Sequence, residues 1–241
     1  MEVIDIRVMR GPNYWSNYRK KLIVVKLNLL QFEYLPTNII NGFNDQLKTL
    51  IPSLYNHRCS FDHEGGFFIR LAEGTWLGHV IEHVALELQW LAGMKCGFGR
   101  TRSTYEKGIY HVVFSYEIED AGLYAAHAAI KLVKNLANQQ PYLGLVNDIE
   151  HLNSLYEKEK LGPSTEAIII EAERQHIPWT AINHESIIRL GYGCYQKIIH
   201  ATVTSQTNII AADIARDKSL TKKILAANEI PVPNGRVIQN L

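Results

Sequence analysis

Cysteine is scarce in this sequence: three residues in 241, and Cys59, Cys96 and Cys194 are too far apart to form a C-x-x-C pair. An odd number of isolated cysteines argues against a disulfide framework and against a cysteine zinc site, and it favours a reducing cytosol. No apolar run approaches the roughly 20 residues that a membrane-spanning helix needs. The first residues alternate polar and apolar side chains, unlike a signal peptide. We therefore expect a cytoplasmic protein without a membrane partner.

An excess of one charge is also missing, since the formal net charge is +1. Without a strong positive or negative field, the chain is not expected to bind nucleic acid or an anionic membrane. Apolar residues make up 46% and charged residues 20% of the sequence, which is ordinary for a globular protein with a buried core. The length fits one or two domains. No internal repeat or low-complexity tract is present.

The hydrophobic patterns predict an α+β fold for the first part of the chain. Apolar positions at helical spacing predict helices, and runs of β-branched and aromatic residues predict strands. The predicted strands cover 3–9, 22–29, 67–71 and 109–116, and the predicted helices cover 39–50, 75–91 and 121–138. The polar, helical stretch 147–160 is the predicted linker.

The character of the sequence changes near Lys160. Pro163 and Ser164 are start signals for a helix over 166–175, and Ile177-Pro178-Trp179 leads into a strand. An alternation of helix and strand suggests an α/β unit. We therefore predict a small mixed α/β domain over 1–160 and a second unit over 161–241.

The helix predicted over 75–91 contains H-x-x-E-H, the inverted zinc-peptidase pattern. Its apolar residues share one broad face, and His79, Glu82 and His83 fall on the other. Imidazoles at i and i+4 can reach one tetrahedral ion, and Glu82 beside them can take a proton from the attacking water. The pattern predicts Zn²⁺ on His79 and His83 with Glu82 as general base. The alternative is a solvated helix face without a metal.

The local sequence does not supply a third ligand for such an ion. Glu87 lies one turn beyond His83, and three remote side chains are candidates that only folding could bring close. These are Glu64, Glu106 and His111. The third ligand therefore stays open at this stage.

Two arginines follow the helix in the glycine-rich segment 95–102. Its glycines allow a close backbone approach, and Arg100 and Arg102 could bind carboxylates or position a peptide. A hairpin turn with solvated arginines explains the same residues.

A second group of candidates lies near the end of the sequence. Gly162-Pro163-Ser164-Thr165 opens a helix, whose free N–H groups and hydroxyls could bind a substrate carboxylate, although Ser and Thr are also common as simple helix caps. Asp217-Lys218-x-x-x-Lys222, followed by Ile230-Pro231-Val232-Pro233, resembles the first-lobe helix and turn of an ATP-grasp nucleotide site. Lys218 matches the phosphate-side lysine. A charged amphipathic helix before a proline-rich turn is the alternative.

Together these stretches resemble the cyanophycin synthetase family, ligases that build a poly-aspartate backbone carrying arginine on each side chain. The matching segments run through nearly the whole chain in order: 57–60, 74–89, 91–94, 97–102, 161–165, 190–193 and 217–218. The resemblance implies that 1–160 engages the polymer and can carry a peptidase-like site on its H-x-x-E-H helix. It implies that 161–241 begins an ATP-grasp domain that activates the terminal carboxylate of the growing polymer and adds aspartate to it.

The resemblance also implies cofactors and partners. These are ATP and Mg²⁺ for full-length members, a cyanophycin-like polymer or primer, aspartate, and homo-oligomers of the full-length form. Ser164, Thr165 and Asp213 are the implied substrate contacts, with Asp213 where the family typically has the longer Glu. The second ATP-grasp lobe and the arginine-adding domain are expected to lie outside this sequence, and would be partners if separately encoded.

Three hypotheses follow. The chain is the amino-terminal part of a cyanophycin-synthetase-type ligase that cannot ligate alone, a stand-alone zinc peptidase acting on such polymers, or a non-catalytic polymer-binding module.

Overall fold

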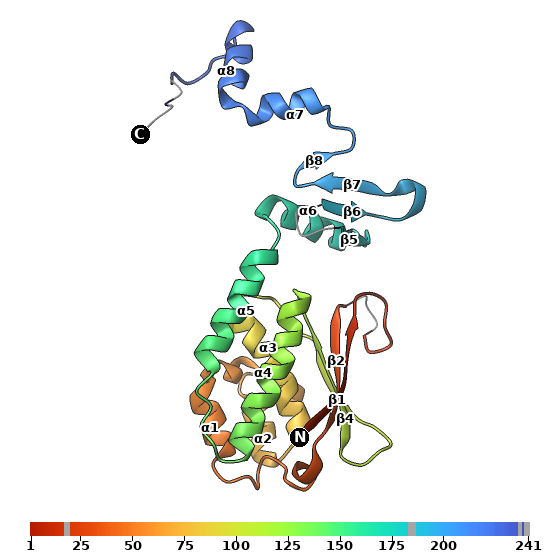
Figure 1. The fold of residues 1–241 in the computed structure, drawn as a ribbon, viewed down its shortest axis with the longest axis vertical. Helices are drawn as coiled ribbons and strands as arrows, with labels where there is room; N and C mark the ends of the chain where they lie inside the picture. The colour runs from red at the N-terminus through yellow and green to blue at the C-terminus, as the bar shows by residue number, and fades with distance from the viewer. Residues whose placement is uncertain (17–19, 183–186, 236–237, 239–241) are drawn as a thin grey trace. The chain divides into compact units, whose positions relative to one another are not determined.

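The computed structural model describes residues 1–16, 20–182, 187–235 and 238. The chain divides into two compact units, Met1–Lys160 and Leu161–Leu241. Figure 1 shows the course of the chain through both units. Within the described ranges, no helix has the length and apolar character needed to cross a membrane.

The first unit is a four-stranded antiparallel sheet with helices gathered on one face (Figure 1). The strand order is β1-β2-β4-β3, so β3 lies at one edge. The strands are β1 (Glu2–Met9), β2 (Leu22–Asn28), β3 (Gly99–Ser103) and β4 (Ile109–Ser115). The helices are α1 (Phe43–Leu50), α2 (Gly66–Glu73), α3 (Leu77–Leu91), α4 (Glu119–Ala137) and α5 (Leu145–Glu159), with short 3-10 turns η1 (Leu30–Tyr34), η2 (Pro52–Asn56) and η3 (Cys59–Phe61).

Side chains of β2 alternate between two hydrophobic clusters, one on each face of the sheet. Ile23 and Val25 join the large core that the helices form, whereas Leu22 and Val24 join a smaller cluster with Val113. Successive side chains of a strand point to opposite faces, so this strand is apolar on both.

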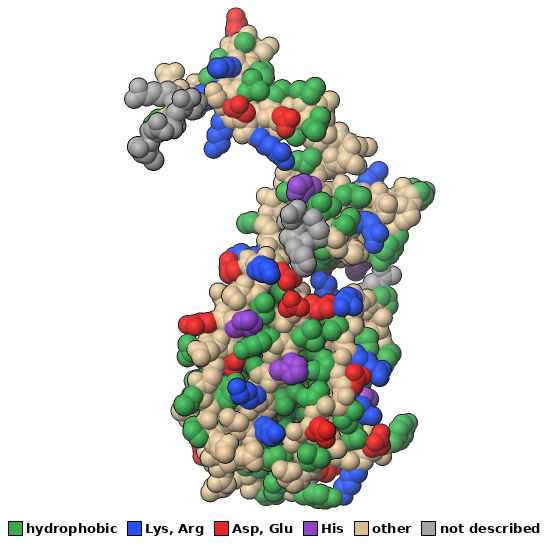
Figure 2. Space-filling view, viewed as in Figure 1, with side chains coloured by type: hydrophobic (Ala, Val, Ile, Leu, Met, Phe, Trp, Pro, Cys, Tyr) green, Lys and Arg blue, Asp and Glu red, His purple; other side chains and the backbone are tan. Residues whose placement is uncertain are grey.

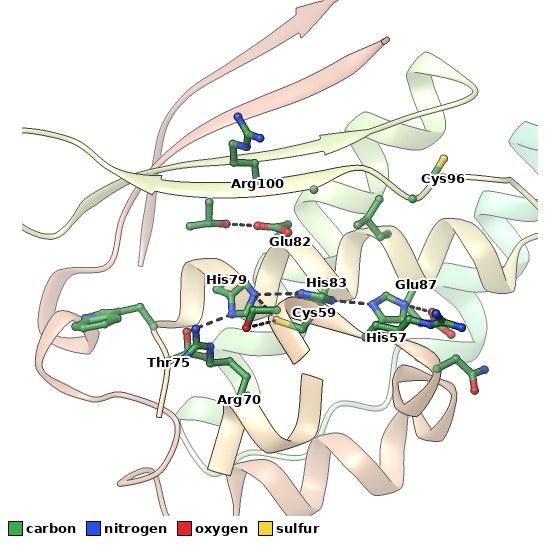
Figure 3. A pocket seen from close by; sticks show the side chains of 18 of the residues that line it. His57, Cys59, Arg70, Thr75, His79, Glu82, His83, Glu87, Cys96 and Arg100 are labelled. Atoms are coloured by element: carbon green, nitrogen blue, oxygen red, sulfur yellow. Dashed lines mark hydrogen bonds and ion pairs between the residues drawn. The ribbon is translucent and has the colours of Figure 1, made fainter. Parts of the chain in front are cut away.

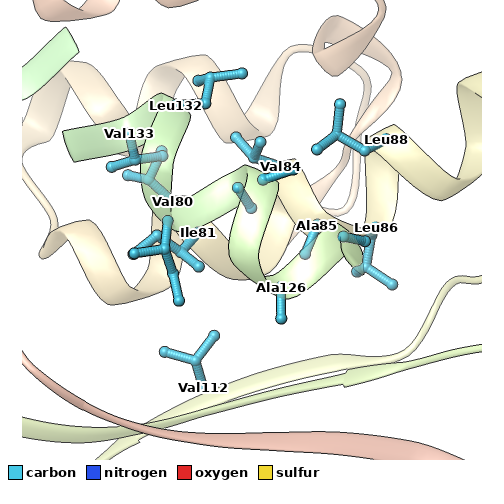
Figure 4. Close-up of a cluster of buried hydrophobic side chains, with 14 of the residues drawn as sticks. Val80, Ile81, Val84, Ala85, Leu86, Leu88, Val112, Ala126, Leu132 and Val133 are labelled. Carbon is cyan, nitrogen blue, oxygen red and sulfur yellow. The ribbon is translucent and has the colours of Figure 1, made fainter. Parts of the chain in front are cut away.

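Helix α3 lies at the centre of the large core. Figure 4 shows Val80, Val84 and Leu88 of α3 beside α4, with Val112 of the sheet close by. Most of the α3 side chains are buried, including the polar Glu82 and His83. A helix buried nearly all round holds its side chains in fixed directions, because close packing leaves few alternative rotamers.

Most of the predicted elements of this unit are confirmed. The strands at 3–9, 22–29 and 109–116 and the helices at 75–91 and 121–138 occur within about two residues of their predicted ends, while the helix predicted over 39–50 begins only at Phe43. The strand predicted over 67–71 is wrong. Gly65 adopts a left-handed φ of 82° before α2, and Phe67 and Leu71, four residues apart, are buried on the same side of that helix.

The stretch 147–160 is helical, as predicted, but it is not a linker. Leu152 of α5 is fully buried in the large core. Asp148 is also buried and accepts hydrogen bonds from the Tyr124 hydroxyl at 2.8 Å and the Tyr142 hydroxyl at 2.5 Å. These contacts attach α5 to the first unit, and the polar composition that suggested a linker belongs to its exposed side.

The second unit combines helices with an antiparallel sheet whose strands follow chain order. Helices and strands both occur, as predicted, but among the described residues only the short 3-10 turn η4, and no α-helix, lies between the four strands. The elements are α6 (Pro163–Arg174), β5 (Trp179–Ala181), β6 (Ile187–Leu190), η4 (Gly193–Tyr195), β7 (Lys197–His200), β8 (Val203–Thr204), α7 (Ile209–Arg216) and α8 (Lys218–Ala227). Ile169, Ile188 and Ile199 form its core.

Helices α7 and α8 contact each other but contain no buried residue among those described. Ile209 and Ile210 are 75% and 66% exposed, and Figure 2 shows hydrophobic side chains along α7. The same view shows acidic and basic side chains interspersed over the visible face, in keeping with the net charge of +1.

Two helical glycines provide a test of the packing around α3 and α4. A Cβ added at Gly122 would lie 2.6 Å from Cβ of Tyr116 and 3.1 Å from a side-chain carbon of Ile23. The overpacking penalty, up to about 3 kcal/mol, should exceed the roughly 1 kcal/mol that alanine gains over glycine inside a helix. Calorimetry of the full chain should show Gly122→Ala lowering the unfolding midpoint of the first unit by about 3–6 °C.

Gly78→Ala is the matched control, because a Cβ there would meet its nearest neighbours at 3.5 Å, an ordinary van der Waals distance. This variant should unfold at or above the wild-type midpoint. Equal midpoints for Gly122→Ala and wild type would show that α4 is not held closely against the sheet.

Candidate metal centre

A cavity of about 1230 Å³ opens in the first unit beside α3 (Figure 3). Its walls come from the segment 53–60, from α3 and from β3. Charged side chains of both signs line it: Arg58, Arg70, Arg100, Arg102, Glu82 and Glu87. The cavity therefore offers guanidinium groups for carboxylates next to a cluster of histidines.

The cluster is built on α3, whose 3.6-residue period places His79 and His83 one above the other. Their Nε2 atoms lie 3.1 Å apart, and Sγ of Cys59 lies 3.5 Å from Nε2 of His79. Within the ranges that the structure describes, one group of at least three histidine, cysteine or acidic side chains could hold a metal ion, and it consists of these three residues. Its ligand atoms all lie within 4.8 Å of one another.

Cys59 reaches the cluster because the chain before α2 is folded tightly against that helix. The backbone N–H of Phe67 donates to the carbonyl of His57 at 3.1 Å, and a Cβ at Gly66 would lie 2.0 Å from the carbonyl oxygen of Arg58. Only glycine fits at that approach. Cys59 itself has a left-handed φ of 52°, which is uncommon for a residue with a side chain and is held by its surroundings.

Burial gives both histidines the electrostatic character of metal ligands. Desolvation, followed by the charge of Arg70, lowers the pKa of His79 to about 4. Desolvation, followed by His79 and His57, lowers the pKa of His83 well below its ordinary value. The imidazoles are therefore neutral at pH 7, the form that binds a metal. The helix face is not solvated, since only 8% of His83 and 5% of Glu82 are exposed.

The donor set fits a zinc-like ion. Tetrahedral zinc, with bonds of about 2.0–2.1 Å to nitrogen and 2.3 Å to sulfur, needs ligand atoms roughly 3.3–3.6 Å apart. Two of the three separations, 3.1 and 3.5 Å, are close to these values, and the third, between Cys59 and His83, is within 4.8 Å. Three protein ligands leave a fourth position for water or substrate, as in catalytic zinc sites.

Glu82 points toward β3, and Cys59 lies on the other side of the imidazoles (Figure 3). Oε2 of Glu82 accepts a hydrogen bond from the Thr101 hydroxyl at 2.6 Å. Burial raises the pKa of Glu82 to about 7, and Thr101 and the two arginines of β3 oppose this only in part. A carboxylate with a pKa near the working pH is well suited to accept and return a proton.

Gly99 brings β3 close to this carboxylate, since a Cβ at that position would lie 2.3 Å from Oε1 of Glu82. Arg100 and Arg102 follow in the same strand and line the cavity. The guanidinium of Arg100 lies 5.7 Å from the centre of the Phe98 ring. Residues 99–102 of this segment belong to an edge strand that pairs antiparallel with β4, and both arginines are exposed, as the alternative of a hairpin with solvated arginines also expects.

Cys59, the third member of the cluster, was not among the candidates named from the sequence. Cys59 is twenty residues from His79 and has no spacing that marks it as a ligand, and isolated cysteines argue against a cysteine zinc site. Glu87 instead pairs with His57. The remaining candidates lie elsewhere: Glu64 lines a second cavity, Glu106 pairs with Lys26, and His111 contacts Trp15.

The candidates of the second unit lie on three different helices. Ser164 is exposed and Thr165 is buried at the start of α6, and the cap residue there is Gly162, without a side-chain hydrogen bond. The simple helix-cap explanation is therefore wrong for both hydroxyls. Asp213 is exposed on α7, and Lys218 is exposed at the first position of α8. Asp217 caps α8 by accepting from the N–H groups of Ser219 and Leu220.

Comparison with known proteins agrees with the resemblance seen in the sequence. Residues 22–138 match the family described as cyanophycin synthase-like N-terminal domain. The first unit belongs to that family. Over its whole length the chain is 48% identical to the cyanophycin synthetase of Trichormus variabilis, and over 99% of its length it is 47% identical to that of a Synechocystis species. The chain spans 27% and 28% of the length of these relatives.

The cluster predicts one divalent ion per chain. Titration with Co²⁺ and elemental analysis after zinc loading should give a stoichiometry near one, with a thiolate-to-cobalt charge-transfer band. His79→Ala and His83→Ala should lose the ion, and Cys59→Ser should lose the charge-transfer band, because each removes one of three ligands. His63→Ala and Cys194→Ser change exposed residues of the same types and should bind as wild type does. Metal content unaffected by all three cluster substitutions would place the ion elsewhere.

Proposed function

We propose that this chain is the amino-terminal portion of a cyanophycin-synthetase-like, ATP-dependent ligase that lengthens a multi-arginyl-poly-aspartate chain. Its similarity to cyanophycin synthetases, at 47–48% identity along essentially all of its length, is the observation that carries this proposal. Identity at this level extends into both units, so it supports a shared role for each of them.

In this proposal the cavity of the first unit binds the polymer. Arginine is the side chain best suited to bind carboxylates through two parallel hydrogen bonds. Arg100 and Arg102 on β3 face the same cavity as Arg58 and Arg70. A polyamide that carries carboxylates, such as a cyanophycin-like chain, has the complementary charge, while Glu82 and Glu87 in the same cavity suit its guanidinium groups.

Hydrolysis of the polymer is a second candidate activity, favoured by the metal-ligand cluster beside Glu82. An ion held by Cys59, His79 and His83 would polarise an amide carbonyl and lower the pKa of water. Glu82 would take the proton of the attacking water and pass it to the leaving amine. This assigns the general-base role that the H-x-x-E-H pattern predicts, in the same protein as the ligase function.

In the second unit we propose that ATP and Mg²⁺ take part in aspartate addition. Lys218 at the exposed start of α8 would contact nucleotide phosphate, and Ser164, Thr165 and Asp213 would contact substrate. Their surroundings differ, since Thr165 is buried whereas the other three are exposed. Ser164, Asp213 and Lys218 are therefore the more accessible members of this set.

The hydrolytic proposal predicts a separation of metal binding from catalysis. Zinc-loaded wild-type chain should cleave a cyanophycin-like peptide, and Glu82→Gln should keep its zinc while losing about 10²–10⁴-fold in rate, the usual contribution of a general base. Glu64→Gln is the matched control on an exposed position. If wild type binds the peptide without cleaving it, the first unit acts as a polymer-binding module. An unchanged rate in Glu82→Gln would remove that residue from the mechanism.

A polypeptide of these 241 residues should show no ATP-dependent aspartate addition, because it spans about a quarter of the relatives' length and α7 and α8 bury none of their described residues. The assay combines ATP, Mg²⁺, aspartate and a primer, and follows phosphate release and primer length. Primer extension coupled to phosphate release would contradict the expectation. Recovery of extension on adding the remaining regions of a full-length relative would support the ligase assignment.

A further inference from the structure

A second line of polar contacts leads away from the metal-ligand cluster. Nδ1 of His83 lies 2.8 Å from Nδ1 of His57, and Nε2 of His57 lies 2.6 Å from Oε2 of Glu87 (Figure 3). Glu87 is one turn after His83 on α3, and His57 comes from the segment between η2 and η3. The three side chains therefore form a hydrogen-bonded series that runs from Glu87 through His57 to Nδ1 of His83. The other ring nitrogen of His83, Nε2, faces His79.

The position of each proton in this chain follows from the carboxylate. An ionised carboxylate can only accept hydrogen bonds, so His57 must carry a proton on Nε2. With the proton of His57 on Nε2 directed at Glu87, its Nδ1 is the nitrogen that faces His83 and can accept from Nδ1–H of His83. His83 protonated on Nδ1 leaves Nε2 with a free lone pair, directed at the cluster formed with Cys59 and His79.

We propose that Glu87 and His57 are positioning residues for the metal centre: they fix the tautomer and the ring orientation of His83, so that its Nε2 is a metal ligand before any ion binds. This inference rests on the metal site proposed above. Metal-bound histidines generally donate their other N–H to an acceptor group, and here the acceptor is an imidazole itself oriented by a carboxylate.

Burial makes this arrangement effective. The side chains of His57 and Glu87 are 17% and 8% exposed, and the ring of Phe67 stacks on His83 with centroids 4.3 Å apart. Burial raises the pKa of Glu87, but hydrogen bonds from His57 and Ser53 outweigh it and leave the pKa below its ordinary value. The carboxylate of Glu87 is therefore ionised at neutral pH.

The other side of the cluster has a similar arrangement. Nδ1 of His79 lies 3.2 Å from the Thr75 hydroxyl oxygen, which can accept a hydrogen bond from Nδ1–H. Both histidines then direct unprotonated Nε2 atoms at each other across 3.1 Å. Two facing lone pairs repel, and a cation between them relieves that repulsion. The hydrogen bonds of His57 and Thr75 thus leave both Nε2 atoms available to a cation.

The tautomer of His83 is directly measurable in the metal-free full chain. Two-bond ¹H–¹⁵N correlation spectra of chain labelled with ¹⁵N-histidine distinguish protonated from unprotonated ring nitrogens. Wild type should show His83 protonated on Nδ1, although free histidine prefers Nε2. A His83 ring protonated on Nε2 in wild type would overturn the proposal.

Variants then connect the tautomer to metal binding. His57→Phe and Glu87→Met remove the acceptors, and they should shift His83 toward the Nε2-protonated form and weaken Co²⁺ binding about 10–100-fold. His57→Asn and Glu87→Gln keep an oxygen acceptor in a similar place and should recover most of the affinity. Glu64→Gln, on an exposed residue, should match wild type.

Retention of both the tautomer and the Co²⁺ affinity in His57→Phe and Glu87→Met would overturn the proposal, whatever their unfolding midpoints. If one of these variants does not fold, the wild-type spectrum and the two conservative variants still decide. Failure of wild type to bind Co²⁺ would contradict the proposed metal site itself. The spectrum of the metal-free protein would still test the hydrogen bonds among Glu87, His57 and His83.

Discussion

Burial of α3 is the constraint on which the rest of the first unit depends. The helix packs its apolar side against α4 and the sheet, and its polar side is covered by the segment 53–60 and by β3. Burying an isolated histidine or carboxylate would lower the free energy of unfolding by several kcal/mol unless the group were hydrogen-bonded or neutralised. His83 and Glu82 meet that condition through His57 and Thr101. The core and the site are thus consequences of the same packing.

That packing also separates two chemical roles along one helix. His79 and His83 lie on the side covered by Cys59, where desolvation keeps imidazoles neutral. Glu82 lies on the side covered by β3, where desolvation raises the pKa of the carboxyl group. Lowering the pKa of a base and raising that of an acid have one physical cause, the loss of water around the charged form. The helix face therefore presents neutral ligands and a proton acceptor within one cavity.

Local patterns in the sequence predicted what local geometry determines. The strands around β2 and β4, the long helices α3 and α4, and the pairing of His79 with His83 depend on residues within a turn or two of each other. Cys59 and His57 could not be found in this way, because their positions depend on how 52–67 folds back, through contacts such as the one between Gly66 and Arg58. The helix wheel also gave the wrong environment, since it assigns polar residues to solvent and cannot show that another segment covers them. The ATP-grasp assignment of the second unit stays a prediction.

The close approach of Gly99 to Glu82 has an evolutionary consequence. The space that a methyl group would need at position 99 is occupied by the carboxylate at position 82. A relative that keeps this carboxylate can accept a larger residue at 99 only if the Glu82 side chain or β3 moves, whereas a relative that has replaced it with a small side chain is free to vary there. The two positions should therefore change together. The residue at 99 would then record, in each lineage, whether the proton acceptor of this cavity is still under selection.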